Sequence, residues 1–222
     1  MSLTAASHVI VLGGSSGIGL AVARAAAATG ARVTVGSRSS GEHPVDVTSP
    51  ESLAAFFAAA GAFDHLVYTA GDELVSGPIT EYDPVRARDF FDVRLFRALD
   101  AVRLALPTLS GSGSVTLTAG AAAFHGGPGR LLGSAIGGAV ITAARSLAIE
   151  LAPIRVNVVA PGIVRTPLWA EAPAGLLDRL GAATLLGRVA EPEDAAKAYV
   201  ALLDQDYVTG TVAVVDGGSI LT

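Results

Sequence analysis

The chain has 222 residues, of which 51% are hydrophobic, with no cysteine and a formal net charge of −5. This length predicts a single α/β domain over residues 1–222, and the acidic balance without a basic block argues against nucleic acid as a partner. Four scattered histidines predict no metal site. With no uninterrupted apolar stretch of roughly 18 residues and no signal-peptide pattern, we expect a cytoplasmic protein without a membrane partner.

Short apolar runs alternate with longer amphipathic stretches along the chain. The runs predict strands at residues 8–12, 32–35, 44–47, 65–68, 114–118, 155–159 and 211–215. The stretches predict helices at residues 17–29, from about 49 onward, 84–106, 134–151 and 192–203. Ser49 before Pro50 favours a helix N-cap. Strands alternating with helices are typical of a parallel, doubly wound sheet. Two long loops, 119–133 and 161–175, would lie at the carboxyl ends of strands, where such sheets bind ligands.

A glycine-rich turn follows the first predicted strand and precedes the first predicted helix. It reads Gly13-Gly14-Ser15-Ser16-Gly17-Ile18-Gly19. The first glycine permits a sharp turn, and the later ones let backbone approach a pyrophosphate at the helix amino terminus, where free N–H groups favour an anion. The two serines add hydroxyl donors. Turns need glycine for other reasons too, but the strand–turn–helix setting favours a dinucleotide site.

The end of the second predicted strand indicates which dinucleotide is bound. A carboxylate there binds the ribose 2′-hydroxyl of NAD, whereas a basic residue accommodates the 2′-phosphate of NADP. The sequence reads Gly36-Ser37-Arg38-Ser39, and the first acid is Glu42. We expect Arg38 and its flanking serines to hold a phosphate by charge-assisted hydrogen bonds, the alternative being an arginine on a solvated turn. NADP(H) is therefore favoured over NAD(H).

These and later segments resemble the short-chain dehydrogenase/reductase family over essentially the whole chain. The glycine turn is similar to the family's Thr-Gly-x-x-x-Gly-x-Gly motif, with Leu12 in place of Thr. The other matching segments are Asp46-Val47, similar to the pair that meets the adenine; Thr69-Ala70-Gly71, similar to the Asn-Asn-Ala-Gly turn without its asparagines; residues 155–162, similar to the strand and Pro-Gly turn beside the nicotinamide; and the C-terminal residues 207–210 and 216–218.

The resemblance implies a three-layer Rossmann fold with a seven-stranded parallel sheet, an oxidoreductase activity and assembly as a homodimer or homotetramer. It also implies how the cofactor is held. Ile163 would offer backbone groups to the carboxamide, and Thr166 a hydroxyl. Besides the glycine turn and the Arg38 segment, the implied cofactor residues are Asp46, Val47, Thr69, Ala70, Gly71, Pro161, Gly162, Ile163 and Thr166.

The chain departs from the family where a proton is supplied to the substrate. The family's reductases use an Asn, a Ser, a Tyr and a Lys. Here the only lysine is Lys197, and no tyrosine lies between Tyr82 and Tyr199. By alignment the four positions hold Arg94, Gly120 or Ala119, and residues at or near Gly133 and Gly137. The chain resembles small, atypical members that bind NADPH without this tetrad, and its catalytic residues stay unknown.

Several side chains are candidates to replace the missing acid. Ser134 adjoins the vacated Tyr position, although a helix N-cap is its simpler role. His125 lies in the substrate-side loop and is of a type that titrates near neutrality, or it is simply solvated. Arg94 would stabilise an oxyanion, pair with Asp92 or Asp89, or lie along a subunit interface.

Two further features face the expected nicotinamide. Trp169 either walls the cofactor or packs within a lid. Gly133, Gly137 and Gly138 either enlarge the space above the nicotinamide or permit close helix packing. We therefore expect an NADPH-dependent reductase of a carbonyl-like or quinone-like molecule, with a non-catalytic NADP(H)-binding sensor or interaction protein as the alternative.

Overall fold

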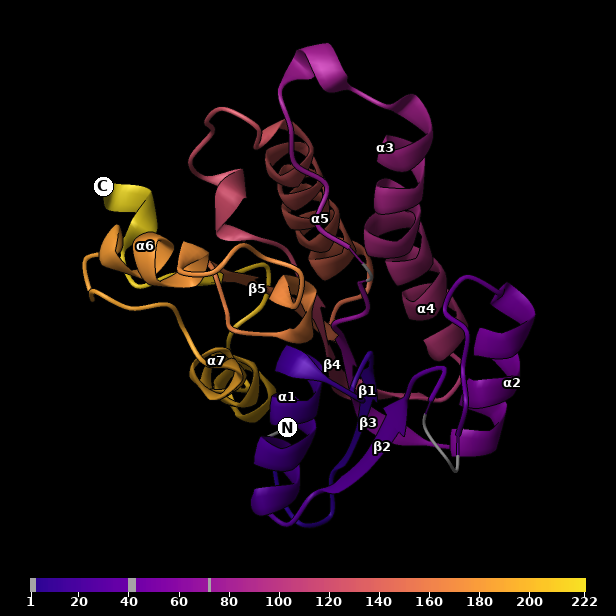
Figure 1. Ribbon diagram of the computed structural model, residues 1–222. Coiled ribbons are helices and arrows are strands. Elements are labelled where there is room, and N and C mark those ends of the chain that lie inside the picture. Colours follow the sequence, from indigo (N-terminus) through magenta and orange to yellow (C-terminus); the bar gives the residue numbers. More distant parts are fainter. Residues whose placement is uncertain (1–2, 40–42, 72) are drawn as a thin grey trace.

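A parallel sheet with the strand order β2-β1-β3-β4-β5-β6 forms the centre of the molecule (Figure 1). The structure is a computed structural model that describes residues 3–39, 43–71 and 73–222. The strands are β1 (His8–Leu12), β2 (Arg32–Gly36), β3 (Phe63–Tyr68), β4 (Leu109–Thr118), β5 (Arg155–Pro161) and β6 (Val212–Val215).

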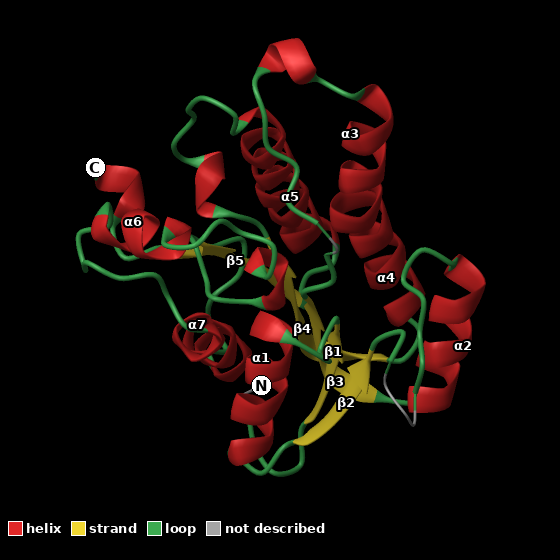
Figure 2. Cartoon of the chain, viewed as in Figure 1, coloured by secondary structure: helices red, strands yellow, loops and turns green. Residues whose placement is uncertain are grey.

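Helices cover both faces of this sheet, which gives the expected three layers (Figure 2). Two helices pack on one face, α1 (Gly17–Ala28) and α7 (Pro192–Asp204). The opposite face is covered by α2 (Pro50–Ala60), α4 (Arg97–Ala105) and α5 (Leu131–Glu150). Two more helices are α3 (Pro84–Phe91), which leads into α4, and α6 (Leu176–Ala182), near the C-terminus.

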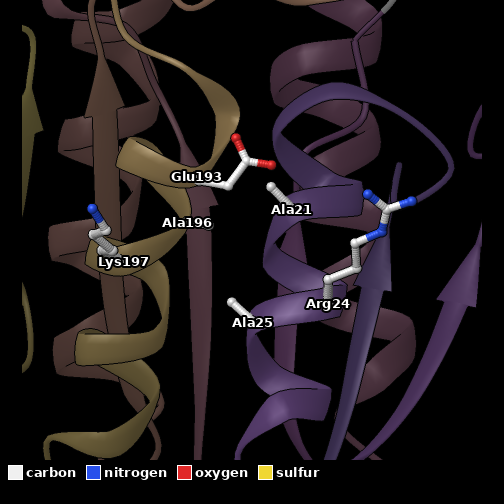
Figure 3. A pocket seen from close by; sticks show the side chains of 6 residues that line it. All are labelled: Ala21, Arg24, Ala25, Glu193, Ala196 and Lys197. Carbon is white, nitrogen blue, oxygen red and sulfur yellow. The ribbon is translucent and has the colours of Figure 1, made fainter.

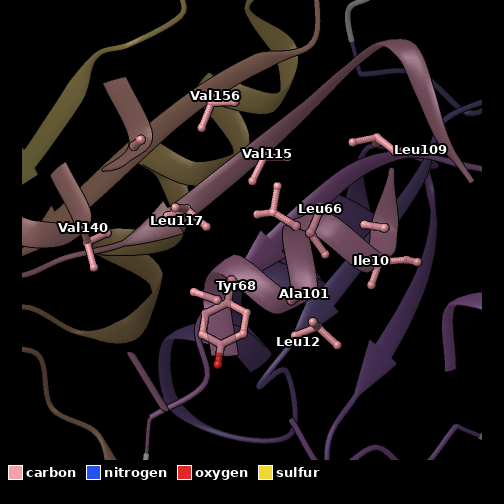
Figure 4. Packing of buried hydrophobic residues seen from close by; sticks show 14 of the residues in the cluster. Ile10, Leu12, Leu66, Tyr68, Ala101, Leu109, Val115, Leu117, Val140 and Val156 are labelled. Atoms are coloured by element: carbon pink, nitrogen blue, oxygen red, sulfur yellow. The ribbon is translucent and has the colours of Figure 1, made fainter. Parts of the chain in front are cut away.

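The core on the α2–α4–α5 face is a set of aligned strand residues (Figure 4). Ile10, Leu66, Val115 and Val156 are register partners across four neighbouring strands, and none is exposed. Full burial of one such side chain contributes about 1.5–3 kcal/mol. The helix α5 is long and apolar enough to cross a membrane by length and composition, and its buried residues, such as Val140, pack on this core.

The expected third strand at residues 44–47 is wrong, and the sheet has six strands among the described residues rather than seven. A single parallel bridge between Ser37 and Pro44 is all that remains of the pairing. The reason is local, because the carboxylate of Asp46 accepts hydrogen bonds from the N–H and Oγ1 of Thr48 and turns the chain toward α2. The N-cap predicted for α2 is confirmed, since Ser49 Oγ accepts from the N–H of Ser52.

The helix expected over residues 84–106 is interrupted by a π-helical turn, Asp92–Phe96. Tyr68 Oη donates to the carbonyl of Val93 in this turn over 2.6 Å. Such insertions widen a helix by one residue and often lie at functional sites. Other differences from expectation are that β4 begins at Leu109, that α5 begins at Leu131 and so shortens the loop before it, and that the helix α6 was not predicted.

Candidate cofactor and active site

The glycine turn is held by contacts that only glycine permits. Gly13 has a φ of 86°, and its N–H donates to the carbonyl of Gly36 over 2.8 Å. A Cβ at Gly13 would lie 2.7 Å from the backbone nitrogen of Ala70. A Cβ at Gly19 would collide with the carbonyl oxygen of Gly13 and with Oγ1 of Thr69. The turn therefore presents backbone without side chains at the carboxyl edge of the sheet.

The amino terminus of α1 leaves backbone donors for a ligand. Ser16 is its N-cap, yet the side chain makes no capping hydrogen bond to any residue that the structure describes. Ser15 and Ser16 are both exposed, and Ile18 packs against the α1–α7 core. The first N–H groups of a helix have no partner within the helix, so this end suits a phosphate group.

The end of β2 lies beside the glycine turn. Gly36 is packed so closely that a Cβ there would lie 2.6 Å from the side chain of Leu12. The hydroxyls of Ser37 and Ser39 approach within 3.4 Å of each other, and Arg38 is exposed between them. A guanidinium flanked by hydroxyls is the donor set that suits a 2′-phosphate.

The pair expected beside the adenine lies where the chain enters α2. Hydrogen bonds from Thr48, helped by the charge of Arg38, hold the pKa of Asp46 below its usual range. Val47 is half-buried against the core. The carboxylate of Asp46 is therefore held in its ionised form by Thr48. Glu42, the first acid after the second strand, lies outside the described residues.

The turn after β3 forms the next part of the edge. The N–H and Oγ1 of Thr69 both donate to the carbonyl of Leu12, each over 2.9 Å. These two bonds tie the ends of β1 and β3 together. Ala70 follows with its backbone against Gly13, and Gly71 is exposed. The predicted neighbours of the glycine turn are therefore in place.

The segment after β5 reaches back over the glycine turn. A Cβ at Gly17 would lie 3.2 Å from Cγ2 of Thr166. The 3-10 turn Pro167–Trp169 follows, in which Trp169 is half-buried. The structure thus brings together the segment predicted to bind the pyrophosphate and the segment predicted to lie beside the nicotinamide.

Residues 161–163 are fixed by partners that the sequence did not single out as site residues. The N–H of Gly162 donates to the carbonyl of Val215, and a Cβ at Gly162 would lie 2.8 Å from Cα of Asp216. The carbonyl of Ile163 accepts from the N–H of Ala190 over 3.0 Å. The Asp-Gly-Gly motif that contains Asp216 was the only sequence signal for this support.

The vacated Lys position is closed by a neighbouring turn. Gly137 lies on α5 against the 3-10 turn Ala121–Ala123. A Cβ at Gly137 would lie 2.9 Å from the Cβ of Ala123 and 3.3 Å from the carbonyl of Gly120. Close packing, rather than extra room, is therefore the reason for glycine at this position.

The vacated Tyr position is more open. A Cβ at Gly133 would meet the Cβ of Ala122 at 3.8 Å, an ordinary contact. At Gly120 and Gly138 a Cβ would find no atom of the described residues within 4 Å. Of the three glycines expected either to enlarge this space or to allow close packing, Gly138 has open space, Gly133 has one ordinary contact and Gly137 is closely packed against the described residues.

The residues considered as replacement acids have these surroundings. The N-cap of α5 is Arg130, so the N-cap role expected for Ser134 is wrong. Ser134 Oγ is buried, without a hydrogen-bond partner among the described residues. His125 is exposed in the loop before α5. Among the described residues, neither side chain has a hydrogen-bond partner that would prepare it as an acid.

Arg94 lies in the π-helical turn, at the position matched to the family's Asn. Its Nη2 donates to the carbonyl of Glu73 over 2.7 Å, and its guanidinium lies 4.4 Å from the ring centroid of Phe90. The ion pair considered with Asp92 is made by Arg97 instead, over 3.0 Å.

The remaining tyrosine and lysine of interest, Tyr199 and Lys197, both lie on α7. Tyr199 bonds Thr118 Oγ1 over 2.7 Å, and burial raises its pKa. Lys197 is on the rim of a groove of about 330 Å³ between α1 and α7 (Figure 3). The groove is lined by Ala21, Arg24, Ala25, Glu193, Ala196 and Lys197, none of them an expected cofactor residue.

Comparison with known proteins agrees with this arrangement. The family model described as enoyl-(acyl carrier protein) reductase matches residues 13–219. The short-chain dehydrogenase/reductase ATR9 of Stachybotrys chlorohalonatus is 32% identical and aligned over 96% of each chain. A solved small-chain dehydrogenase in complex with NADPH has a TM-score of 0.92 at 34% identity, over 97% of this chain and 99% of its own.

A second solved structure also has NADPH bound. It is a variant of ElxO with one tyrosine replaced by phenylalanine and NADPH bound, with a TM-score of 0.88, 25% identity, and coverage of 97% of this chain and 99% of its own. The two NADPH-bound neighbours support the predicted cofactor, NADP(H). Given the family match and the similarity to ATR9 along almost the whole length, the chain belongs to the short-chain dehydrogenase/reductase family.

Proposed function

We propose that this chain is an NADPH-dependent oxidoreductase that reduces a carbonyl-like or quinone-like small molecule without a Tyr–Lys acid pair. One contrast supports this proposal. The glycine turn closes against Ala70 and Thr166 as a cofactor site requires, whereas Gly137 is covered by Ala123 where a lysine would stand. When bound, NADPH supplies the hydride for such a reduction.

The residues of this edge would bind and orient the cofactor. The N–H groups at the start of α1 would bind the pyrophosphate, and Arg38 with its two serines would bind the 2′-phosphate. Thr166 and the backbone of Ile163 would fix the nicotinamide end. Holding two reactants in a near-attack geometry can by itself account for much of a rate enhancement.

The missing acid restricts the acceptor. Losing a positioned general acid typically costs about 10²–10⁴-fold in rate. The loss matters less when the reduced oxygen is weakly basic. A quinone fits this requirement, because its reduction gives a phenolate, which is far less basic than the alkoxide from a simple ketone.

A non-catalytic NADP(H)-binding protein is the second candidate. It is favoured by the contact between Ala123 and Gly137, because a closed Lys position is a built feature and not a simple gap. A sensor or interaction protein would need the cofactor edge alone.

Turnover with a panel of quinones, diketones and aldehydes separates these candidates, with NADPH absorbance as the readout. We expect oxidation of NADPH with at least one quinone, and its loss in Gly17→Trp, which fills the glycine turn. Gly111→Ala is the matched control, since a Cβ at Gly111 meets no described atom within 4 Å. Tight NADPH binding with no turnover on any acceptor would favour the non-catalytic candidate.

The cofactor preference has its own test. Arg38→Asp should lower the NADPH-to-NADH affinity ratio by roughly 10- to 100-fold, because it removes a charge-assisted hydrogen bond. Arg88→Asp, an exposed arginine on α3, controls for net charge. An unchanged ratio would show that the 2′-phosphate does not contact this turn.

A further inference from the structure

Arg94 is built into the wall of the cofactor edge. The π-helical turn carries it, and its guanidinium is held between the Phe90 ring at 4.4 Å and the Glu73 carbonyl at 2.7 Å. It also lies flat against Gly71: a Cβ there would be 3.0 Å from both Cζ and Nη2 and 3.1 Å from Nη1. Because Gly71 has no side chain, the guanidinium plane can lie directly against its backbone.

This contact continues to the glycine turn. Residues 69–71 contact Arg94 on one side and the glycine turn on the other. The Ala70 backbone packs on Gly13, and Thr69 Oγ1 lies against Gly19. The residue before this segment is also fixed, because Tyr68 Oη donates a hydrogen bond to the carbonyl of Val93, next to Arg94. Displacing the guanidinium would free one side of residues 69–71.

We propose that Arg94 is a positioning residue for the nicotinamide half of the cofactor, acting by holding Gly71 and its neighbours in place beside the path of that half. The proposal rests on the proposed function, because it needs NADPH as the ligand. Arg94 is not assigned contact with the substrate or the reacting atoms.

The order of the strands decides which half of the cofactor is affected. Along the carboxyl edge, Arg38 follows β2, the glycine turn follows β1 and Gly71 follows β3. A cofactor with its 2′-phosphate at Arg38 and its pyrophosphate at the glycine turn would extend past β3 with its nicotinamide half. A fragment that ends at the adenosine 5′-phosphate would stop before Gly71.

Calorimetric titration with two ligands tests this assignment. For Arg94→Gln we expect NADPH affinity to fall about tenfold, as for the loss of one charged hydrogen bond, with adenosine 2′,5′-bisphosphate affinity within about twofold of wild type. Arg94→Lys should not restore NADPH affinity, because an ammonium lacks the plane that lies on Gly71. Equal weakening of both ligands, or of neither, would overturn the proposal.

A double substitution checks the contact independently of overall folding. Gly71→Ala should weaken NADPH binding in the wild type, because its methyl displaces the guanidinium. In the Arg94→Gln background, the same change should have less effect, since a smaller side chain has replaced the guanidinium. Strictly additive effects would contradict a direct contact between the two residues.

The matched control is Arg86→Gln. Arg86 pairs with the carboxylate of Glu73 over 3.2 Å, but both side chains are about half exposed, and exposed pairs contribute little. We expect unchanged affinity for both ligands, and a loss equal to that of Arg94→Gln would overturn the special role of Arg94. Failure of the proposed function is distinguishable, because wild-type protein would then bind NADPH without reducing any acceptor, or would not bind it.

Discussion

In the glycine turn, a Cβ at Gly13 or Gly19 would collide with the backbone of a neighbouring segment, whereas a Cβ at Gly133 on α5 would meet only an ordinary contact among the described residues. Both regions are rich in glycine, and both face the expected cofactor. In the first, glycine allows chain segments to approach; in the second, glycine leaves space.

Gly137 belongs physically with the glycine turn, although it lies one helical turn from Gly133. Its close neighbour is the methyl group of Ala123, so packing keeps a side chain out. The comparison teaches that a glycine must be interpreted from what lies against it. At this edge of the sheet, glycine forms the cofactor turn, allows close packing at Gly137 and leaves an ordinary contact at Gly133.

The strongest test of the comparison is Gly19→Val. The new side chain would collide with the Gly13 carbonyl and Thr69, so we expect NADPH affinity to fall by more than about 100-fold and unfolding free energy to fall by about 1–3 kcal/mol. Calorimetry and urea unfolding measure the two effects. Gly138→Ala is the control, with unchanged affinity; near-normal binding by Gly19→Val would break the comparison.

Loss of stability at acid pH limits the pH range in which variants of the two regions can be compared. Burial, aided by the charge of Arg155, lowers the pKa of His65 from 6.5 to about 4. The imidazole of His65 takes up its proton at a higher pH in the unfolded chain than in the folded protein. The free energy of unfolding is therefore highest above pH 6.5 and falls by about 3 kcal/mol in all as the pH drops toward 4. Urea unfolding across this range should lose most of that slope in His65→Gln. An unchanged slope would show that other groups dominate.

Alanine substitutions on α5 sharpen the distinction between the two vacated positions. Gly133→Ala should stabilise the protein by up to about 1 kcal/mol, because alanine favours helix over glycine. Gly137→Ala should instead destabilise it by about 1–2 kcal/mol, because the methyl groups of residues 137 and 123 would overlap. Thermal unfolding measures both, and Ala123→Gly should rescue only the second. Equal stabilisation by both would break the distinction.

The smallest expected effect concerns Ser134. Its hydroxyl is buried without a partner in the described part of the chain, so Ser134→Ala should change unfolding free energy by less than about 1 kcal/mol, toward greater stability. Turnover with the best acceptor should be unchanged. A large loss of turnover with intact NADPH affinity would instead identify Ser134 as the replacement acid.

Local patterns were sufficient to predict most of the sheet. Strands such as β1 and β5 are continuous apolar runs, and their ends carry the glycine turn and the Pro161-Gly162 turn that place the cofactor edge. The third strand was wrong because Asp46 uses its carboxylate to form a turn, an interaction that competes with strand pairing.

For the proton-donor part of the site, the sequence predicted only which residues are missing. Residue counts establish that no Tyr–Lys pair stands there, but they do not reveal that Ala123 covers Gly137, because an alanine-rich turn carries no pattern of its own. The contact of Arg94 with Gly71 was equally hidden, since it depends on the π-helical turn that rotates Arg94 relative to a regular helix.

The contact between Ala123 and Gly137 also means that no single substitution can place a long side chain at position 137 without moving the neighbouring turn. A lysine there would need a compensating change at Ala123, since an added Cβ at Gly137 would lie 2.9 Å from the Cβ of Ala123. An engineered acid pair on this helix therefore has to begin in the turn and not on the helix.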